Sequence, residues 1–284
     1  MTRSSPWFLF AVLAAASVVP AAPAALASGA YPWLEAPSDL SLETRFPAPE
    51  GFRRVSPATD SYPAWLRGLP LARGVDVVRS HDGERLERPA AAVVLMDVGR
   101  GDLQQCADSA IRLHAEYLWA SGKADEAAYH FTSGDRSSWD DWRAGERFAV
   151  AGSRVERVSG APRGGGHAAY RGWLQHLFRY AGTRSLRLDT RAVPEDEPLL
   201  AGDVFLEPGS PGHAVVILDI AEDSSGRRVA LLGQGFMPAE DFHVLESRGA
   251  RGGVWFALPR AGERVETPSW RPFHRRDVRR FSGP

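Results

Sequence analysis

The sequence predicts an α+β fold in which a cysteine-bearing helix packs on an antiparallel sheet. Residues 102–121 carry apolar side chains three and four positions apart and are followed by Gly122, which is typical of an amphipathic helix. After residue 200 the chain reads as short strands, "GDVFLEPGSPG", "HAVVILDIAED" and "RVALLGQGFMP", separated by turn residues such as "SSGR". Because the helical segments come first and the strands follow, instead of alternating with them, we expect segregated helices and an antiparallel sheet.

The N-terminal segment has the features of a secretory signal peptide. Arg3 precedes a nearly apolar run over residues 7–25, and Ala25-Leu26-Ala27 offers a small-residue cleavage site. The alternative is an uncleaved membrane anchor, but Pro20 and Pro23 interrupt the run. We therefore expect residues 1–27 to be a signal peptide and the protein to be exported, either periplasmic or secreted.

Residues 28–284 are expected to form a single domain, in which residues 28–60 make an extended lead-in rich in proline and aromatic residues. "VDVVRS" (75–80), the turn "HDGE" and "AAVVLMDV" (91–98) predict a strand-rich N-terminal extension, and "AWLRGLPL" (64–71) predicts a short helical turn. Residues 129–148 read as a polar loop dotted with aromatics, and residues 169–182 as an amphipathic helix.

The composition excludes several classes of function. A formal net charge of −1 argues against a dedicated nucleic-acid-binding protein. No segment after the signal peptide approaches the ~18 apolar residues that a membrane span needs. The histidines form no HExxH pattern, so we expect no zinc-peptidase site. We also expect no metal, no cofactor and a monomeric protein.

Cys106 is the only cysteine in the chain, and an odd thiol in an exported protein is a candidate reactive group. It lies in the first turn of its predicted helix, where backbone N–H groups and the helix dipole stabilise a thiolate. The alternative is a small buried core residue. Asp108, Arg112 and Glu116 lie four residues apart and predict a solvated, charge-paired face on the same helix.

A nucleophilic thiol needs a base, and His213 opens an apolar strand directly after the turn-rich "EPGSPG". The alternative role for His213 is that of a strand-end residue capping a turn. Asp219 shares its face but lies six residues along the strand, roughly 20 Å away, too far to orient the imidazole. If the hairpin turns at residues 223–226, Val215 faces Gln234, and Gln234 becomes the diagonal neighbour of His213. Gln104 or Gln105 could supply an amide donor to an oxyanion.

A cysteine at a helix N-terminus followed by "GDVFLEPGSPGHAVVILD" resembles the papain-like superfamily, especially the NlpC-type and CHAP-type bacterial cell-wall peptidases. Over most of its length the chain also resembles an uncharacterised bacterial family known as domain of unknown function 4846. The segments that carry this second resemblance include "RGDLQQCADSAIRLHAEYLWA", "FTSGDRSSWDDWRAGERF" and "LLGQGFMPAEDFHVL".

The papain-like resemblance implies a papain-like fold with Cys106 as nucleophile, His213 as base and Gln234 as the orienting polar residue. One of Gln104 and Gln105 would then be the oxyanion donor. These roles describe an exported cysteine hydrolase that cleaves an amide bond, with a peptide or a peptidoglycan-like polymer as its substrate. The alternative, from another class of function, is a non-catalytic envelope protein that uses the same cleft to bind peptide or glycan.

A candidate substrate-binding segment is "FTSGDRSSWDDWRAG", which combines aromatic rings with charged side chains. Rings and charges together suit contact with a peptide or a glycan. The alternative is that the two tryptophans are ordinary core residues. The candidate contact residues in this segment are Ser133, Asp135, Trp139, Trp142 and Arg143.

Overall fold

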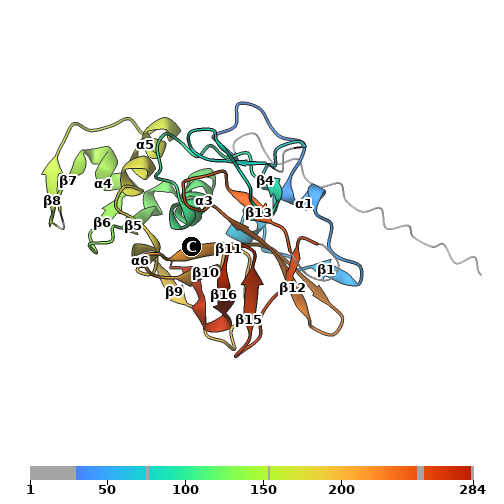
Figure 1. The fold of residues 1–284 in the computed structure, drawn as a ribbon. Coiled ribbons are helices and arrows are strands. Elements are labelled where there is room, and N and C mark those ends of the chain that lie inside the picture. The colour runs from blue at the N-terminus through green and yellow to red at the C-terminus, as the bar shows by residue number, and fades with distance from the viewer. Residues whose placement is uncertain (1–29, 75–76, 153, 248–252, 283–284) are drawn as a thin grey trace, which may run out of the picture.

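The computed structural model describes residues 30–74, 77–152, 154–247 and 253–282. The predicted signal peptide lies outside these ranges. The described chain is a mixed fold of helices and strands built on a large antiparallel sheet (Figure 1). The α+β class predicted from the sequence is therefore confirmed.

Nine strands form the large sheet, in the order β4-β13-β12-β11-β10-β17-β9, with β1 paired to β11 and β14 paired to β12. The central hairpin consists of β11 (His213–Asp223) and β12 (Arg228–Gln234). The other strands of this sheet are β1 (Phe52–Arg54), β4 (Ala90–Val93), β9 (Thr190–Ala192), β10 (Val204–Glu207), β13 (His243–Leu245), β14 (Trp255–Ala257) and β17 (Val278–Phe281).

Four two-stranded sheets complete the strand content. They are formed by β2 (Val78–Arg79) with β3 (Arg85–Leu86), β5 (Ala128–His130) with β6 (Arg136–Ser138), β7 (Glu146–Ala151) with β8 (Arg154–Ser159), and β15 (Arg264–Thr267) with β16 (Trp270–His274). The α-helices are α1 (Leu42–Arg45), α2 (Tyr62–Arg67), α3 (Cys106–Ala120), α4 (Trp139–Ala144), α5 (His167–Leu177) and α6 (Thr183–Leu186).

The two faces of the sheet carry separate apolar clusters. Ala214, Val216 and Leu218 of β11 belong to the larger cluster, which also contains the apolar face of α3. Val215 and Ile217 belong to the second cluster, together with residues of β15 and β16. Alternate residues of a strand point to opposite faces, so β11 is buried on both sides. The helices α3, α4 and α5 gather on one side of the molecule in Figure 1.

Two glycines of the β12 segment let neighbouring groups approach the sheet closely. A Cβ at Gly235 would stand 2.5 Å from the Ser109 Oγ atom of α3, and a Cβ at Gly233 would stand 2.7 Å from Leu218 Cδ1. No real Cβ tolerates such distances, so α3 packs against backbone at this point.

The central hairpin follows the predicted register at its open end and departs from it near the turn. Val216 faces Gly233 and Ile217 faces Leu232, which puts Val215 opposite Gln234 as the sequence predicted. A bulge then shifts the pairing by one residue, so that Asp219 faces Leu231. Asp219 is fully buried and accepts from Arg54 Nε and Arg67 Nη2, each at 2.6 Å.

Two predictions of local structure are wrong. Residues 129–148 are not a loop, because they contain β6, α4 and parts of β5 and β7. The charged row on α3 is not solvated, because Asp108, Arg112 and Glu116 are all buried. These three side chains face the interior because other polar groups of the fold meet them there, and the next section describes those partners.

Candidate functional site

The thiol of Cys106 lies at the N-terminal end of α3, of which Cys106 is the first residue. Only 5% of the residue is exposed, and its side chain packs in the larger apolar cluster. Three backbone N–H groups near the sulfur, those of Ala214, Ala107 and Cys106 itself, lower the pKa of the thiol. The sulfur therefore sits in a small nest of donors that would favour negative charge there.

Burial has a larger effect on the pKa of the thiol than these donors have. Desolvation, together with the carboxylate of Asp108, raises the pKa of the Cys106 thiol to about 12. The sequence-based expectation that the helix N-terminus produces a thiolate is thus corrected, because the low dielectric around the sulfur penalises charge more than the donors favour it. In this structure the thiol is neutral at physiological pH.

His213 is fully buried at the start of β11 and is bound to Gln234. Its Nε2 atom lies 2.8 Å from Gln234 Oε1, the contact that the hairpin register predicted. The rings of Phe236 and Trp270 cover the imidazole, with centroid distances of 4.8 and 5.0 Å. Desolvation lowers the pKa of His213 to about 4 although the bond to Gln234 opposes the shift, so the ring is neutral.

Cys106 and His213 lie near the same end of β11 but on opposite faces of the sheet. Cys106 packs with Ala214 in the larger apolar cluster, whereas the His213 ring packs against Trp270 and Phe273 on the second face. The N–H of Ala214, the residue after His213, is one of the three that lower the pKa of the Cys106 thiol. The Nδ1 atom of His213 is buried and has no hydrogen-bond partner among the described residues. The thiol is thus near the backbone that follows His213, whereas the bare ring nitrogen lies on the other face of the sheet. The predicted contact between thiol and imidazole is therefore not formed in this structure, because successive residues of a strand point to opposite faces.

Neither glutamine before the thiol offers a side-chain donor to an oxyanion. Gln104 is fully buried; its Oε1 accepts from Arg112 Nη1 at 3.2 Å and its Nε2 donates to the Asp97 carbonyl oxygen at 3.4 Å. The Gln105 amide donates to Asp102 Oδ1 at 3.0 Å. The role predicted for one of these two side chains is therefore corrected, because both amides are already bonded elsewhere.

Gln104 instead belongs to a buried polar network that fixes the segment entering α3. The fully buried guanidinium of Arg112 donates to Glu116 Oε1 at 2.6 Å and to Asp97 Oδ1 at 3.2 Å. The second oxygen of Glu116 lies 2.8 Å from His167 Nε2 of α5. Since Asp97 and Gln104 precede Cys106 by nine and two residues, the network holds the loop that positions the thiol.

The predicted substrate-binding segment does not form a binding surface. Trp139 and Trp142 are buried in the core, where Trp139 packs edge-on against Tyr170. Ser133 and Asp135 bond each other within the turn between β5 and β6.

Arg143 is exposed and pairs with Asp140 within α4, with 2.8 Å between Nη2 and Oδ1. The prediction that the two tryptophans contact substrate is corrected, because both rings are needed to fill the space between α4 and α5.

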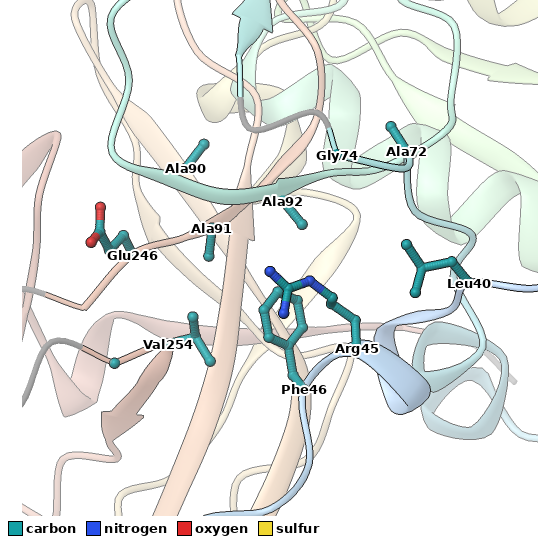
Figure 2. A pocket seen from close by; sticks show the side chains of 11 residues that line it. Leu40, Arg45, Phe46, Ala72, Gly74, Ala90, Ala91, Ala92, Glu246 and Val254 are labelled. Carbon is teal, nitrogen blue, oxygen red and sulfur yellow. The ribbon is translucent and has the colours of Figure 1, made fainter.

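Two hollows open elsewhere on the surface. One, of about 600 Å³, lies beside the edge strand β4, with Arg45 and Phe46 beneath Ala92 (Figure 2). The other, of about 500 Å³, is walled by Trp33 and by Arg171 and Gln175 of α5. Arg171 Nη1 and Gln175 Nε2 are buried donors without partners among the described residues, and neither atom is exposed to solvent in the hollow.

The described ranges contain neither a membrane-spanning helix nor a cluster of metal ligands. None of the helices there combines the length and the apolar character required to cross a bilayer. No three or more histidine, cysteine or acidic side chains in that part of the chain are grouped so that they could bind a metal ion.

Sequence reasoning missed the polar residues that surround the thiol and the imidazole. Asp108 reaches back to the Gln105 N–H at 3.2 Å, while its other oxygen is buried without a partner. His243 of β13 faces Gln234 across the sheet. The spacing of Asp108 from Gln105 is that of a helix-capping residue and could have been read from the sequence. The pairing of β13 with β12 has no such local signal.

Asp108 gives a testable dependence of stability on pH. Burial raises the pKa of this carboxyl to about 7, so between the unfolded value near 3.8 and about 7 the folded state binds the extra proton. The contribution of Asp108 to stability is thus full below pH ~4 and is lost as the pH rises through 7. Asp108→Asn should remove this loss, making the variant more stable than the parent at pH 8 by on the order of 1–4 kcal/mol and not at pH 4. Urea unfolding at both pH values measures the difference, and an equal difference at the two would contradict the prediction.

The comparisons with known proteins give a family and no activity. No curated protein and no solved structure is similar to the chain. The model of one family, described as a domain of unknown function (4846), matches residues 42–280, a span that includes Cys106, His213 and Gln234. The chain therefore belongs to the family of domain of unknown function 4846.

Proposed function

We propose that the protein is an exported cysteine hydrolase of papain-like arrangement that cleaves an amide bond, with Cys106 as nucleophile, His213 as base and Gln234 as the orienting residue. One observation carries the proposal. Gln234 occupies one nitrogen of His213, the other nitrogen has no partner, and the adjoining N–H of Ala214 approaches the only thiol. A nucleophile, a base and a third group that orients the base is the arrangement that covalent catalysis requires.

Because the Cys106 thiol and the His213 imidazole are both neutral, the proton must leave the thiol during the attack on the substrate. The two side chains leave opposite faces of the sheet, so the start of β11 would have to rearrange before His213 could act on the thiol. The neutral His213 Nδ1 would then take the thiol proton while Cys106 Sγ bonds to the amide carbon, and the carbonyl electron pair would move onto the oxygen. The N–H of Cys106, which has no acceptor within its own helix, would stabilise that oxyanion. Collapse of the intermediate breaks the C–N bond, His213 returns the proton to the amine, and water then hydrolyses the thioester.

Substrate can reach this site only if its aromatic cover moves. Phe236 and Trp270 lie over His213, and Trp270 is tethered through its indole N–H to Glu207 Oε2 at 2.9 Å. An open surface hollow of about 350 Å³ is lined by Trp270 and its neighbours in the β15–β16 turn. Displacement of Trp270 into this hollow would connect His213 with solvent.

The second candidate is a non-catalytic protein that binds peptide or glycan. The hollow beside Trp33 favours it, because an aromatic wall next to the polar side chains of Arg171 and Gln175 suits contact with a sugar or a peptide. The raised pKa of Cys106 also suits a thiol that serves only in packing.

The two candidates are separated by incubating the exported form with purified peptidoglycan and analysing both fractions by mass spectrometry. A hydrolase releases peptides or amines into the supernatant and carries a transient acyl mass on the Cys106 peptide. A binding protein sediments with the polymer and releases nothing. Sedimentation without any product from the wild type would overturn the hydrolase.

Gln234→Ala is expected to lower turnover by roughly tenfold to a hundredfold, less than the loss of Cys106 or His213. A glutamine is neutral, so it orients the imidazole without the stabilisation of imidazolium that a carboxylate gives. The check is kcat on a confirmed substrate beside the melting temperature. A lower melting temperature at unchanged kcat would mean that Gln234 has only a structural role.

A further inference from the structure

Unpartnered polar atoms surround Gln234 on the second face of the sheet. His213, Gln234 and His243 are each no more than 1% exposed. Among the described residues, His213 Nδ1, Gln234 Nε2 and His243 Nε2 are buried without a hydrogen-bond partner. Buried polar atoms are almost always bonded, so three such atoms on neighbouring strands call for a common explanation.

The protonation of His243 follows from its backbone partner. Its Nδ1 atom lies 3.1 Å from the carbonyl oxygen of Asp241, which can only accept, so Nδ1 must carry the proton. Glu240 Oε1, 3.6 Å from the same nitrogen, also favours a proton there, and Arg88 holds that carboxyl from its other side at 2.8 Å. Burial keeps the ring neutral by lowering the pKa of His243 to about 4. Nε2 of His243 is therefore a bare acceptor.

The position of His243 puts this acceptor next to the amide of Gln234. The two residues form a directly opposed pair between β12 and β13, so their side chains leave the same face of the sheet. Opposed residues have Cβ atoms about 5 Å apart, within reach of side-chain contact. His213 and His243 also influence each other electrostatically, which brings all three side chains into one cluster.

We propose that one buried water accepts from Gln234 Nε2 and donates to His243 Nε2, and that His243 thereby sets the proton position on His213. With its NH₂ group directed at His243, the Gln234 amide must present its oxygen to His213. That oxygen accepts only from a protonated Nε2, so the proton of His213 is on Nε2 and its Nδ1 is bare.

The opposite orientation of the amide is disfavoured by the same contacts. If the Gln234 amide were flipped, its oxygen would face the bare Nε2 of His243, which leaves the bridging water between two acceptors, without the donor that Gln234 Nε2 supplies. Its NH₂ group would then face His213 and require the His213 proton on Nδ1, which could then no longer act as a base. His243 is thus a positioning residue that keeps His213 in the form of a base.

The assignment of the two tautomers stands without the proposed hydrolysis, whereas the catalytic use of Nδ1 rests on the proposed function. The test is therefore spectroscopic. In protein labelled with ¹⁵N-histidine, two-bond ¹H–¹⁵N correlations at pH 7.5 report which nitrogen of each ring is protonated. The signals of His213 and His243 are assigned by their loss in His213→Gln and His243→Gln.

In the wild type we expect His213 as the Nε2–H tautomer and His243 as the Nδ1–H tautomer. His243→Leu removes the acceptor and should convert His213 to a mixture containing Nδ1–H. His243→Gln can offer an amide oxygen to Gln234 and should restore the single Nε2–H form. The matched control is His114→Leu, since His114 is also a buried neutral histidine, bonded to Tyr129, and should leave the His213 signals unchanged.

An unchanged Nε2–H tautomer of His213 in folded His243→Leu overturns the proposal, as does an Nδ1–H tautomer of His213 in the wild type. The wild-type spectrum decides even if the leucine variant does not fold. A tautomer change in His243→Leu, in a protein that hydrolyses nothing, would refute the hydrolase and support the positioning role. Hydrolysis by the wild type together with an unchanged Nε2–H tautomer of His213 in His243→Leu would support the hydrolase and refute the positioning role of His243.

Discussion

Cys106→Ser is expected to abolish hydrolysis, with a loss of at least about a thousandfold in kcat/KM, while the fold is retained. The serine hydroxyl has a much higher pKa than the thiol, and the His213 imidazole, whose pKa burial lowers to about 4, is too weak a base to activate it. The same low pKa predicts that activity persists well below pH 6, since the base loses its function only when His213 becomes protonated.

The measurements are the rate of product release from purified peptidoglycan and the melting temperature of each protein. Cys106→Ala serves as a control that removes the nucleophile without adding a hydroxyl in the apolar cluster. If Cys106→Ser retains wild-type activity on a confirmed substrate, the role of the thiol as nucleophile is wrong.

Arg112→Met is expected to cause the largest loss of stability, roughly 3–5 kcal/mol, because it leaves a buried carboxylate without its main partner. Arg112 is fully buried and donates to Glu116, Gln104 and Asp97. Methionine fills a similar volume, so the loss reports the missing hydrogen bonds more than a cavity. The free energy of unfolding in urea is the measurement.

The matched control is Arg73→Met. Arg73 pairs with Asp39, and their side chains are 70% and 72% exposed. An exposed pair contributes at most about 1 kcal/mol because water and salt screen it. Equal losses in the two variants would show that the buried network around Arg112 adds nothing beyond a surface ion pair.

Local patterns in the sequence were sufficient to predict the central hairpin and the contact between His213 and Gln234. The apolar runs bounded by "SSGR" define two antiparallel strands, and the period of two then brings Gln234 beside His213. The predicted register is reached only after a bulge between Ile217 and Asp219 compensates a one-residue shift at the turn. No turn residue in the sequence indicates that bulge, because it lies within a continuous apolar run.

The same patterns failed where the fold buries charge. A spacing of four among Asp108, Arg112 and Glu116 is common on solvated helix faces, and the sequence alone favours that interpretation. In the structure, His167 of α5 forms a hydrogen bond with Glu116, and Asp97 of the preceding loop accepts a hydrogen bond from Arg112. Those partners are distant in sequence or lie outside any regular element, so periodicity cannot identify them. The tryptophans of α4 were misread for the same reason.

The close packing of α3 on Gly235 sets the distance between this helix and the sheet. A methyl group at Gly235 would stand 2.5 Å from Ser109 Oγ, so any side chain there requires the Ser109 side chain or helix α3 to shift. Cys106 begins that helix, whereas His213 belongs to the sheet, and each is held by its own set of bonds. The spacing between the Cys106 helix and the sheet is therefore set at this point by a residue that carries no functional group at all. Substituents of increasing size at that glycine would change this spacing step by step.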